Sequence, residues 1–269
     1  MLEVNKIYNT DCAEGLKLLD DASIDLVVTS PPYDNLRKYN GYTFDFEKIA
    51  AEIYRVMKIG GVVVWIVNDA TICGSETGTS FKQALFFKKI GFNLHDTMIY
   101  QKCGCYFSEQ NRYYPNFEYM FVFSKGKPRT VNLIADRKNK CAGDTVTGTW
   151  RGADGILKIK SAVKNKTGRK IPDYGVRFNI WQYPVGNGKS SKNRNVFKHP
   201  AVFPENLARD HIISWSDEGD LVLDPFMGSG TTAKVAIETK RNFIGFEISR
   251  EYCEIANKRL EEDLNVWTD

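Results

Sequence analysis

Apolar side chains follow two different spacings along the first 124 residues of the chain. Residues 24–30 and 62–67 contain short, nearly continuous runs of apolar and β-branched side chains, which indicate buried strands. Over residues 44–57 the apolar positions recur every three to four residues, which predicts a helix that Gly60 and Gly61 end. The same patterns predict further strands at 5–9, 94–101 and 117–124, the last two paired antiparallel, and helices at 13–19 and 80–90.

The alternation of helix and strand patterns returns after residue 203. It predicts helices at 204–215, 231–239 and 250–264 and strands at 221–223 and 242–247. Neither block has enough strands for a stable sheet of its own, whereas together they supply about seven. The pattern therefore predicts one α/β sheet, mostly parallel, that is assembled from both ends of the chain.

The middle of the chain, residues 125–197, has a different composition. Regular periodicity fades, Gly, Asn, Lys and Ser accumulate, and only short strand candidates remain at 156–159 and 176–181. Between Lys125 and Pro200 there are 18 Lys or Arg against four Asp, while the remaining residues hold 19 basic and 29 acidic side chains. This asymmetry predicts a separate small unit that faces a polyanion.

Composition narrows the class of protein further. A chain of 269 residues with 42% apolar content can bury one large core and a smaller appended unit. No apolar run approaches the ~20 residues that span a bilayer, and the first residues lack the pattern of a signal peptide. The six cysteines are scattered, and the close pair Cys103 and Cys105 has no second pair to complete a zinc site. We therefore expect reduced thiols, no metal and a cytoplasmic location.

Two loops carry the chemistry that the sequence offers. Thr-Ser-Pro-Pro-Tyr at 29–33 follows one predicted strand, and Asp-Pro-Phe-Met-Gly-Ser-Gly-Thr-Thr at 224–232 follows another. Because the carboxyl ends of parallel strands share one edge of a sheet, the two loops are expected to form one site. Glu247 ends the next strand, where an acid can accept hydrogen bonds from ribose hydroxyls. The glycine loop lacks the Gly-Lys-Ser/Thr ending that binds nucleoside triphosphates.

These strings resemble the two hallmark motifs of S-adenosylmethionine-dependent DNA amino-methyltransferases, and their order, catalytic motif first, is that of the β class. The resemblance implies a Rossmann-like class I methyltransferase sheet, circularly permuted, with an inserted small target-recognition unit. Residues 1–124 and 198–269 would be the two parts of the catalytic domain. Residues 125–197 would be the target-recognition region, which the resemblance covers only by position and charge.

The resemblance also implies which residues hold S-adenosylmethionine. Phe226 would pack on the adenosine, Glu247 would hold the ribose and Asp11 would contact the adenine ring. The segment His-Pro-Ala-Val-Phe-Pro-Glu at 199–205 would cradle the methionine part, although His199 is also suited to a structural turn. The full predicted set is Asp11, His199, Pro200, Asp224, Phe226, Gly228, Gly230, Thr231 and Glu247.

The catalytic motif fits the methylation of an exocyclic amino group. The lone pair of such a nitrogen is delocalised into the base, so acceptors that pull on its N–H bonds are needed. Ser30 and the carbonyl of Pro31 are suited to this role, Pro31 and Pro32 stiffen the backbone, and Tyr33 offers a ring on which a base can stack. No proline is followed by cysteine, so the Pro-Cys nucleophile typical of cytosine C5 methylation is absent.

Ser-Pro-Pro-Tyr is typical of cytosine-N4 enzymes within this family. The sequence therefore favours transfer to cytosine N4 in a specific duplex sequence, in restriction–modification. Transfer to adenine N6 is the alternative reaction. The alternative that is not an enzyme is a catalytically silent regulator that only binds DNA.

Duplex DNA is the expected binding partner. A cognate restriction endonuclease is a further expected partner, which would act separately on the same DNA sequence. The sequence leaves a monomer and a homodimer open. The resemblance also implies a second aromatic that stacks on the flipped base, either Tyr114 or Phe117, although packing in the core is favoured for Phe117. The predicted DNA-binding residues are Arg37, Lys38, Tyr114, Lys158, Lys160, Lys164, Lys166, Arg169 and Lys170, of which the lysines and arginines would contact phosphates.

Overall fold

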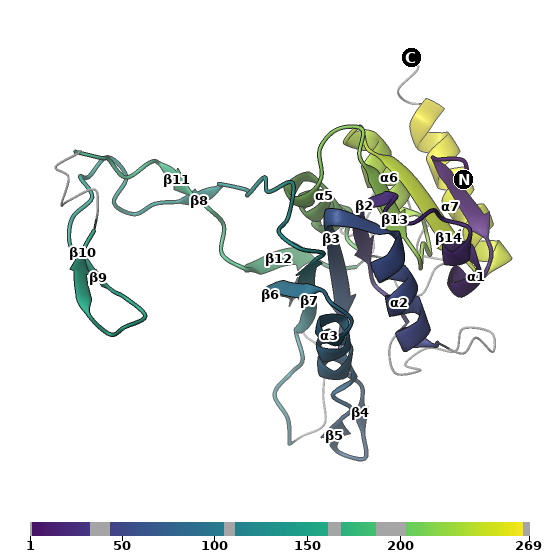
Figure 1. Ribbon diagram of the computed structural model, residues 1–269, viewed down its shortest axis with the longest axis horizontal. Coiled ribbons are helices and arrows are strands. Elements are labelled where there is room, and N and C mark those ends of the chain that lie inside the picture. Colours follow the sequence, from purple (N-terminus) through teal and green to yellow (C-terminus); the bar gives the residue numbers. More distant parts are fainter. Residues whose placement is uncertain (1, 33–43, 105–110, 161–167, 187–202, 266–269) are drawn as a thin grey trace. The chain divides into compact units, whose positions relative to one another are not determined.

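The computed structural model describes residues 2–32, 44–104, 111–160, 168–186 and 203–265. The chain divides into two compact units. Figure 1 labels the helices and strands of both. The large unit comprises Met1–Asn132 and Asn179–Asp269, and the small unit comprises Leu133–Phe178.

The large unit is built on an eight-stranded sheet with the order β1-β14-β13-β2-β3-β7-β6-β12 (Figure 1). The strands in chain order are β1 (Lys6–Asn9), β2 (Ile24–Thr29), β3 (Met57–Val67), β6 (Asn93–Cys103), β7 (Phe117–Ser124), β12 (Ile180–Pro184), β13 (Leu221–Asp224) and β14 (Asn242–Glu247). β7 runs antiparallel to both of its neighbours, and every other neighbouring pair in this sheet is parallel. Seven strands therefore end at one edge, which we call the carboxyl edge.

Helices cover the sheet on two faces. α1 to α3 contact one another in sequence, and so do α5 to α7 (Figure 1). The bounds are α1 (Cys12–Lys17), α2 (Phe46–Val56), α3 (Thr79–Lys89), α5 (Glu205–Trp215), α6 (Thr231–Glu238) and α7 (Arg250–Asn265). Because β2 is covered on both faces, every residue of the strand is buried, including the polar side chains of Asp25 and Thr29.

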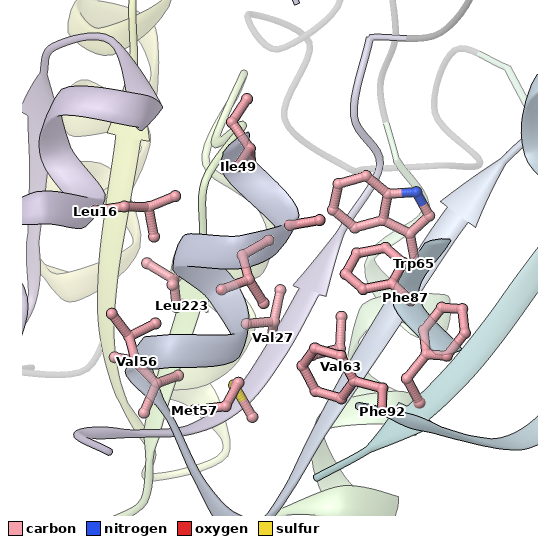
Figure 2. Packing of buried hydrophobic residues seen from close by; sticks show 14 of the residues in the cluster. Leu16, Val27, Ile49, Val56, Met57, Val63, Trp65, Phe87, Phe92 and Leu223 are labelled. Carbon is pink, nitrogen blue, oxygen red and sulfur yellow. The ribbon is translucent and has the colours of Figure 1, made fainter. Parts of the chain in front are cut away.

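The core beneath α2 shows how the sequence pattern produces this packing (Figure 2). Asp45 caps α2 by accepting a hydrogen bond from the backbone N–H of Lys48. Ile49, Ile53 and Val56 then lie on one face of the helix and are fully buried against the sheet. The aromatic side of this core is formed by Trp65, Phe87 and Phe92, which are seen together in Figure 2.

The small unit consists of short hairpins. β8 (Arg137–Lys138) pairs with β11 (Tyr174–Gly175), and β9 (Thr149–Arg151) pairs with β10 (Leu157–Ile159), both antiparallel. Every residue of β9 and β10 is exposed, including Trp150. An isolated two-stranded hairpin is only marginally stable in water, and the side chains of β9 and β10 are exposed rather than packed in a core.

The fold predicted from sequence is confirmed, with local differences. The sheet has eight strands rather than about seven, because residues 180–184 form β12 beside β6, whereas a strand was expected at 176–181. β3 begins at Met57, so Gly60 and Gly61 lie within a strand and do not end the helix.

Two further features were not expected or differ from expectation. Phe117 is 37% exposed instead of packing in the core. The small hairpin of β4 (Thr71–Ile72) and β5 (Ser75–Glu76) had no predicted counterpart. The assignment of functions to 1–124, 125–197 and 198–269 stays a prediction.

The part of the chain that the structure describes contains neither a membrane-spanning helix nor a cluster of metal ligands. None of the helices in this part of the chain is both long enough and apolar enough to cross a membrane. The same residues contain no group of three or more His, Cys, Asp and Glu side chains arranged to hold a metal ion.

Candidate active site

The winding direction of the sheet reverses between β13 and β2. From β2 the chain proceeds through β3 toward β7 and β6, whereas from β13 it proceeds to β14 on the other side. Ligands of open α/β sheets bind outside the carboxyl ends of the strands at such a switch point. The tetrapeptide Ser30–Tyr33 follows β2, and the glycine-rich segment that begins at Pro225 follows β13. The two motifs predicted to form one site therefore leave neighbouring strands.

Two side-chain hydrogen bonds join the ends of these strands. The Thr29 hydroxyl donates to a carboxylate oxygen of Asp224 at 2.6 Å, and both groups are buried. The Thr232 hydroxyl, from the first turn of α6, donates to the carbonyl of Val28 at 3.3 Å. The end of β2, and with it the start of the tetrapeptide, is thus bonded both to the last residue of β13 and to the first turn of α6.

Asp224 organises the start of the loop. The oxygen that accepts from Thr29 also accepts from the backbone N–H of Phe226 at 3.0 Å, which turns the chain away from the strand. Asp224 is only 5% exposed, and this burial raises the pKa of its carboxyl, while the hydrogen bonds from the Thr29 hydroxyl and the Phe226 N–H act in the opposite direction.

Glu247, at the end of β14, supports the middle of the same loop. One carboxylate oxygen accepts from the backbone N–H of Gly228 at 2.8 Å, and the other accepts from that of Ser249 at 2.8 Å. Burial raises the pKa of the Glu247 carboxyl, partly offset by these two bonds. The acid predicted to bind a ribose therefore lies against the loop predicted to bind the same ligand.

Two glycines adopt backbone conformations that side chains disfavour. Gly228 has φ +53° and Gly230 has φ +78°. Gly230 caps the amino end of α6, and a Cβ atom placed there would lie 3.0 Å from the Cβ of Ala256 in α7. The close approach of loop and helix thus requires glycine at this position.

Aromatic rings lie beside the loop. Phe226 is half-buried, and its ring centroid lies 5.6 Å from that of Phe44 and 6.2 Å from that of Trp65, both in edge-on geometry. This places an apolar surface next to the polar groups of Asp224 and Glu247, which is a combination that suits a ligand with a flat ring.

Acidic residues follow three adjacent strands of the sheet. Asp11 comes soon after β1, Glu247 ends β14 and Asp224 ends β13, and Ser30 follows β2 next to them. Asp11 is half-buried and caps α1 by accepting from the backbone N–H of Ala13 at 2.7 Å. The row of carboxylates along the carboxyl edge suits an elongated, positively charged ligand with hydroxyl groups, and S-adenosylmethionine has these properties.

The remaining predicted site residues fall into three groups. Ser30 and Pro32 are half-buried and Pro31 is buried, directly after the anchored Thr29. Tyr114 in the large unit and Lys158, Lys160, Arg169 and Lys170 in the small unit are exposed. The predicted residues that lie outside the described part of the chain are Tyr33, Arg37, Lys38, Lys164, Lys166, His199 and Pro200.

One residue at the loop was not predicted. Arg259 of α7 donates to the carbonyl of Ser229 at 2.8 Å and to the hydroxyl of Thr231 at 3.0 Å. In the sequence it is one of many charged residues in a polar helix, so nothing in the local pattern distinguishes it from a solvent-exposed side chain.

Comparisons with known proteins agree with this geometry. Residues 24–258 match the N6_N4_Mtase family, described as DNA methylase. The orphan methyltransferase M.BamHII of Bacillus amyloliquefaciens is 59% identical over 245 residues, which cover 90% of this chain and 91% of the relative.

Solved structures show the same fold. The cytosine-N4-specific PvuII DNA methyltransferase superposes with a TM-score of 0.68 at 20% identity, covering 97% of this chain and 90% of that one. M1.HpyAVI in complex with SAM gives a TM-score of 0.61 at 25% identity, covering 95% of this chain and 98% of that one. The family match, the close relative and the shared fold together show that the chain belongs to the N6/N4 DNA methylase family.

Proposed function

We propose that this DNA methylase transfers the methyl group of S-adenosylmethionine to the exocyclic N4 nitrogen of cytosine within a specific duplex sequence. The observation that carries the proposal is the 2.6 Å hydrogen bond between Thr29 and Asp224, because it holds Ser30 beside the glycine-rich loop. Methyl transfer between two bound groups gains most of its rate from such positioning.

The cofactor would lie along the carboxyl edge of β1, β14 and β13. Glu247 would accept hydrogen bonds from the ribose, Phe226 would pack on the adenosine and Asp11 would contact the adenine ring. Gly228 and Gly230 would let the backbone approach the methionine part. The chemistry that S-adenosylmethionine supplies is an electrophilic methyl group, so the protein needs no nucleophile of its own.

Ser30 and Pro31 would act on the acceptor base. The hydroxyl of Ser30 and the carbonyl of Pro31 accept hydrogen bonds from the amino group and direct its nitrogen toward the methyl group. Buried Pro31 and half-buried Pro32 restrict the backbone, so the direction of the carbonyl is set before the base arrives. The base would leave the duplex stack to reach this point, since its amino group is otherwise paired.

The choice of cytosine rests on Ser30, which is typical of cytosine-N4 enzymes. Adenine N6 is the second candidate, since a serine hydroxyl can accept a hydrogen bond from either amino group. The buried and hydrogen-bonded junction between the motifs disfavours a catalytically silent regulator, because a protein that only binds DNA has no need of it.

DNA recognition would fall to the small unit. Its 46 residues, Leu133–Phe178, contain 11 Lys or Arg against four Asp. On the hairpin of β9 and β10, Lys158 lies over the ring of Trp150 at 5.7 Å, and both side chains are exposed. A two-stranded ribbon fits the major groove, where charged residues contact phosphates and apolar ones contact base edges. A separate endonuclease partner stays a prediction.

Modified-nucleoside mass spectrometry tests the proposal. Unmethylated bacterial DNA is incubated with the protein and S-adenosylmethionine, digested to nucleosides and analysed. N4-methylcytosine is the expected product, and it should be lost with Ser30→Ala. N6-methyladenine alone would replace the cytosine proposal by the adenine one. Cofactor binding without methylation of any duplex would favour the silent regulator. Sequencing of the methylated DNA would then give the recognition sequence.

A further inference from the structure

Arg259 is buried deeply for a charged side chain. Its residue is 1% exposed, and it is among the largest side chains that are fully buried in the described part of the chain. On α7 it shares the inward face with Cys253, Ala256 and Leu260, which are all buried. An apolar side chain is the ordinary occupant of such a position, because a buried charge is costly unless it is paired and hydrogen-bonded.

The contacts of Arg259 join two parts of the protein. Its Nη1 donates to the carbonyl of Ser229 and to the hydroxyl of Thr231, which flank Gly230 in the loop between β13 and α6. Its Nη2 donates to a carboxylate oxygen of Glu205 at 2.7 Å. Glu205 is the first residue of α5, and residues 199–205 form the second segment that was predicted to hold the cofactor.

A chain of charges extends from this pair across the helices. Glu205 also accepts from Lys234 of α6 at 3.3 Å, and Lys234 pairs with Glu238 of the same helix. Glu238 in turn pairs with Arg209 of α5. The side chain of Arg259 donates to the loop, whereas Arg209 lies at the opposite end of this chain of charges.

We propose that Arg259 is a positioning residue for the cofactor, which sets the loop at Ser229–Thr231 and ties it to the start of α5. The proposal rests on the proposed function, since it assigns the loop to S-adenosylmethionine. Arg259 itself lies behind the loop and acts through it. Glycine at 228 and 230 leaves the backbone conformationally permissive, so hydrogen bonds from outside the loop are needed to select one conformation.

The role requires arginine rather than any cation. The planar guanidinium presents donors in a fixed fork, so one side chain reaches a carbonyl, a hydroxyl and a carboxylate together. A lysine retains the positive charge opposite Glu205 but holds its donors on a single nitrogen. Arg259→Lys therefore separates the charge, which a purely structural ion pair needs, from the geometry, which the loop needs.

The test compares Arg259→Lys with Arg209→Lys. Both variants keep their charge and belong to the same chain of charges, but within the described residues the side chain of Arg209 pairs with Glu238 and not with the loop. Isothermal titration calorimetry with S-adenosylmethionine gives the Kd, an electrophoretic shift with a random-sequence duplex gives the Kd for DNA, and thermal denaturation reports the stability of the unliganded protein.

Arg259→Lys is expected to raise the Kd for S-adenosylmethionine about tenfold, as the loss of one hydrogen bond from a charged donor implies, and to change the Kd for DNA less than about twofold. Arg209→Lys is expected to leave both constants unchanged.

Equal cofactor affinity in wild-type protein and Arg259→Lys would overturn the role of Arg259 but not the proposed function. An equal loss of cofactor affinity in Arg209→Lys would do the same, because the loss would then come from altered helix packing. Failure of the wild-type protein to bind S-adenosylmethionine would overturn the proposed function itself, and this proposal with it. A variant Arg259→Met, which fills the same space without charge, is expected to lose at least as much cofactor affinity as Arg259→Lys.

Discussion

Thr29 ends β2 and Asp224 ends β13, and the hydroxyl of Thr29 donates a hydrogen bond of 2.6 Å to the carboxylate of Asp224. The two residues are 195 positions apart in the chain, yet both are the last residues of adjacent parallel strands. Each is the first residue of one of the two motifs. The bond therefore fixes how the start of the first motif and the glycine-rich loop lie relative to one another.

Thr29→Val keeps the shape of the side chain and removes its donor. Leaving a buried acceptor short of a partner costs about 1–3 kcal/mol, so the free energy of unfolding should fall by that amount in urea denaturation. The single-turnover rate of methyl transfer should fall about tenfold or more, because the tetrapeptide is no longer held against the loop. Thr29→Ser retains the hydroxyl and should recover most of both quantities. A full transfer rate in Thr29→Val would contradict the role given to this bond.

Gly230→Ala should weaken the binding of S-adenosylmethionine. The left-handed backbone costs a residue with a side chain about 1–2 kcal/mol, and the new Cβ would also press on Ala256. Gly219→Ala is the matched control, because Gly219 has φ +87° but nothing within 4 Å of its Cβ position. Both variants should lose similar backbone stability in thermal denaturation, but only Gly230→Ala should raise the Kd for the cofactor. Equal cofactor affinity in the two variants would argue against the loop assignment.

Asp224→Asn should change how stability depends on pH. Burial raises the pKa of the Asp224 carboxyl in the folded protein, so the folded state binds this proton more tightly than the unfolded state does. The ionised carboxyl therefore costs stability at pH values above its folded pKa, and the cost fades as the pH falls toward the unfolded value. Asparagine keeps an acceptor for Thr29 and carries no charge.

The measurement is the thermal midpoint of both proteins without cofactor between pH 5 and pH 8. The advantage of Asp224→Asn over the wild type should be largest at pH 8 and should shrink as the pH is lowered. An advantage that grows toward pH 5 would show that the folded protein favours the ionised carboxyl. If Asp224→Asn is as stable as the wild type or more stable but no longer transfers the methyl group, the charge of the Asp224 carboxylate serves the reaction and not the fold.

Lys158 in β10 and Lys160 directly after it should contribute to the salt dependence of DNA binding. Replacing Lys158 and Lys160 with Gln removes two cations that are predicted to contact phosphates. The slope of log K against log salt concentration should fall in magnitude by about 1 for each lost phosphate contact. Lys240→Gln is the control, since Lys240 is an exposed lysine at the turn before β14, at the edge opposite the active site. An unchanged slope in the double variant would exclude these lysines from the DNA interface.

The sequence predicts the parts of the fold that depend on local patterns. β2 is mostly apolar because helices cover both of its faces, and the periodicity of α2 follows from its single buried face. The placement of the two motifs at one edge follows from strand direction alone, and it is confirmed. The residues that predict each of these strands and helices lie within about a dozen positions of one another.

Features that depend on distant partners were missed or misplaced. A strand was predicted at 176–181, but β12 is Ile180–Pro184, because these residues pair with β6, about eighty residues earlier. Arg259 is buried because Glu205 and the loop meet it from other parts of the chain. The hydrogen bond between Thr29 and Asp224 is likewise a product of strand order. Local periodicity holds no information on such pairings.

The division of the sheet between the two ends of the chain has a consequence for biosynthesis. β13, which supplies the cofactor loop, inserts between β14 and β2, so the centre of the sheet is completed by residues that the ribosome makes late. A nascent chain that ends before Leu221 contains the catalytic tetrapeptide but has an open sheet edge where β13 belongs. The enzyme is therefore expected to remain inert until β13 has been synthesised and has taken its place between β14 and β2.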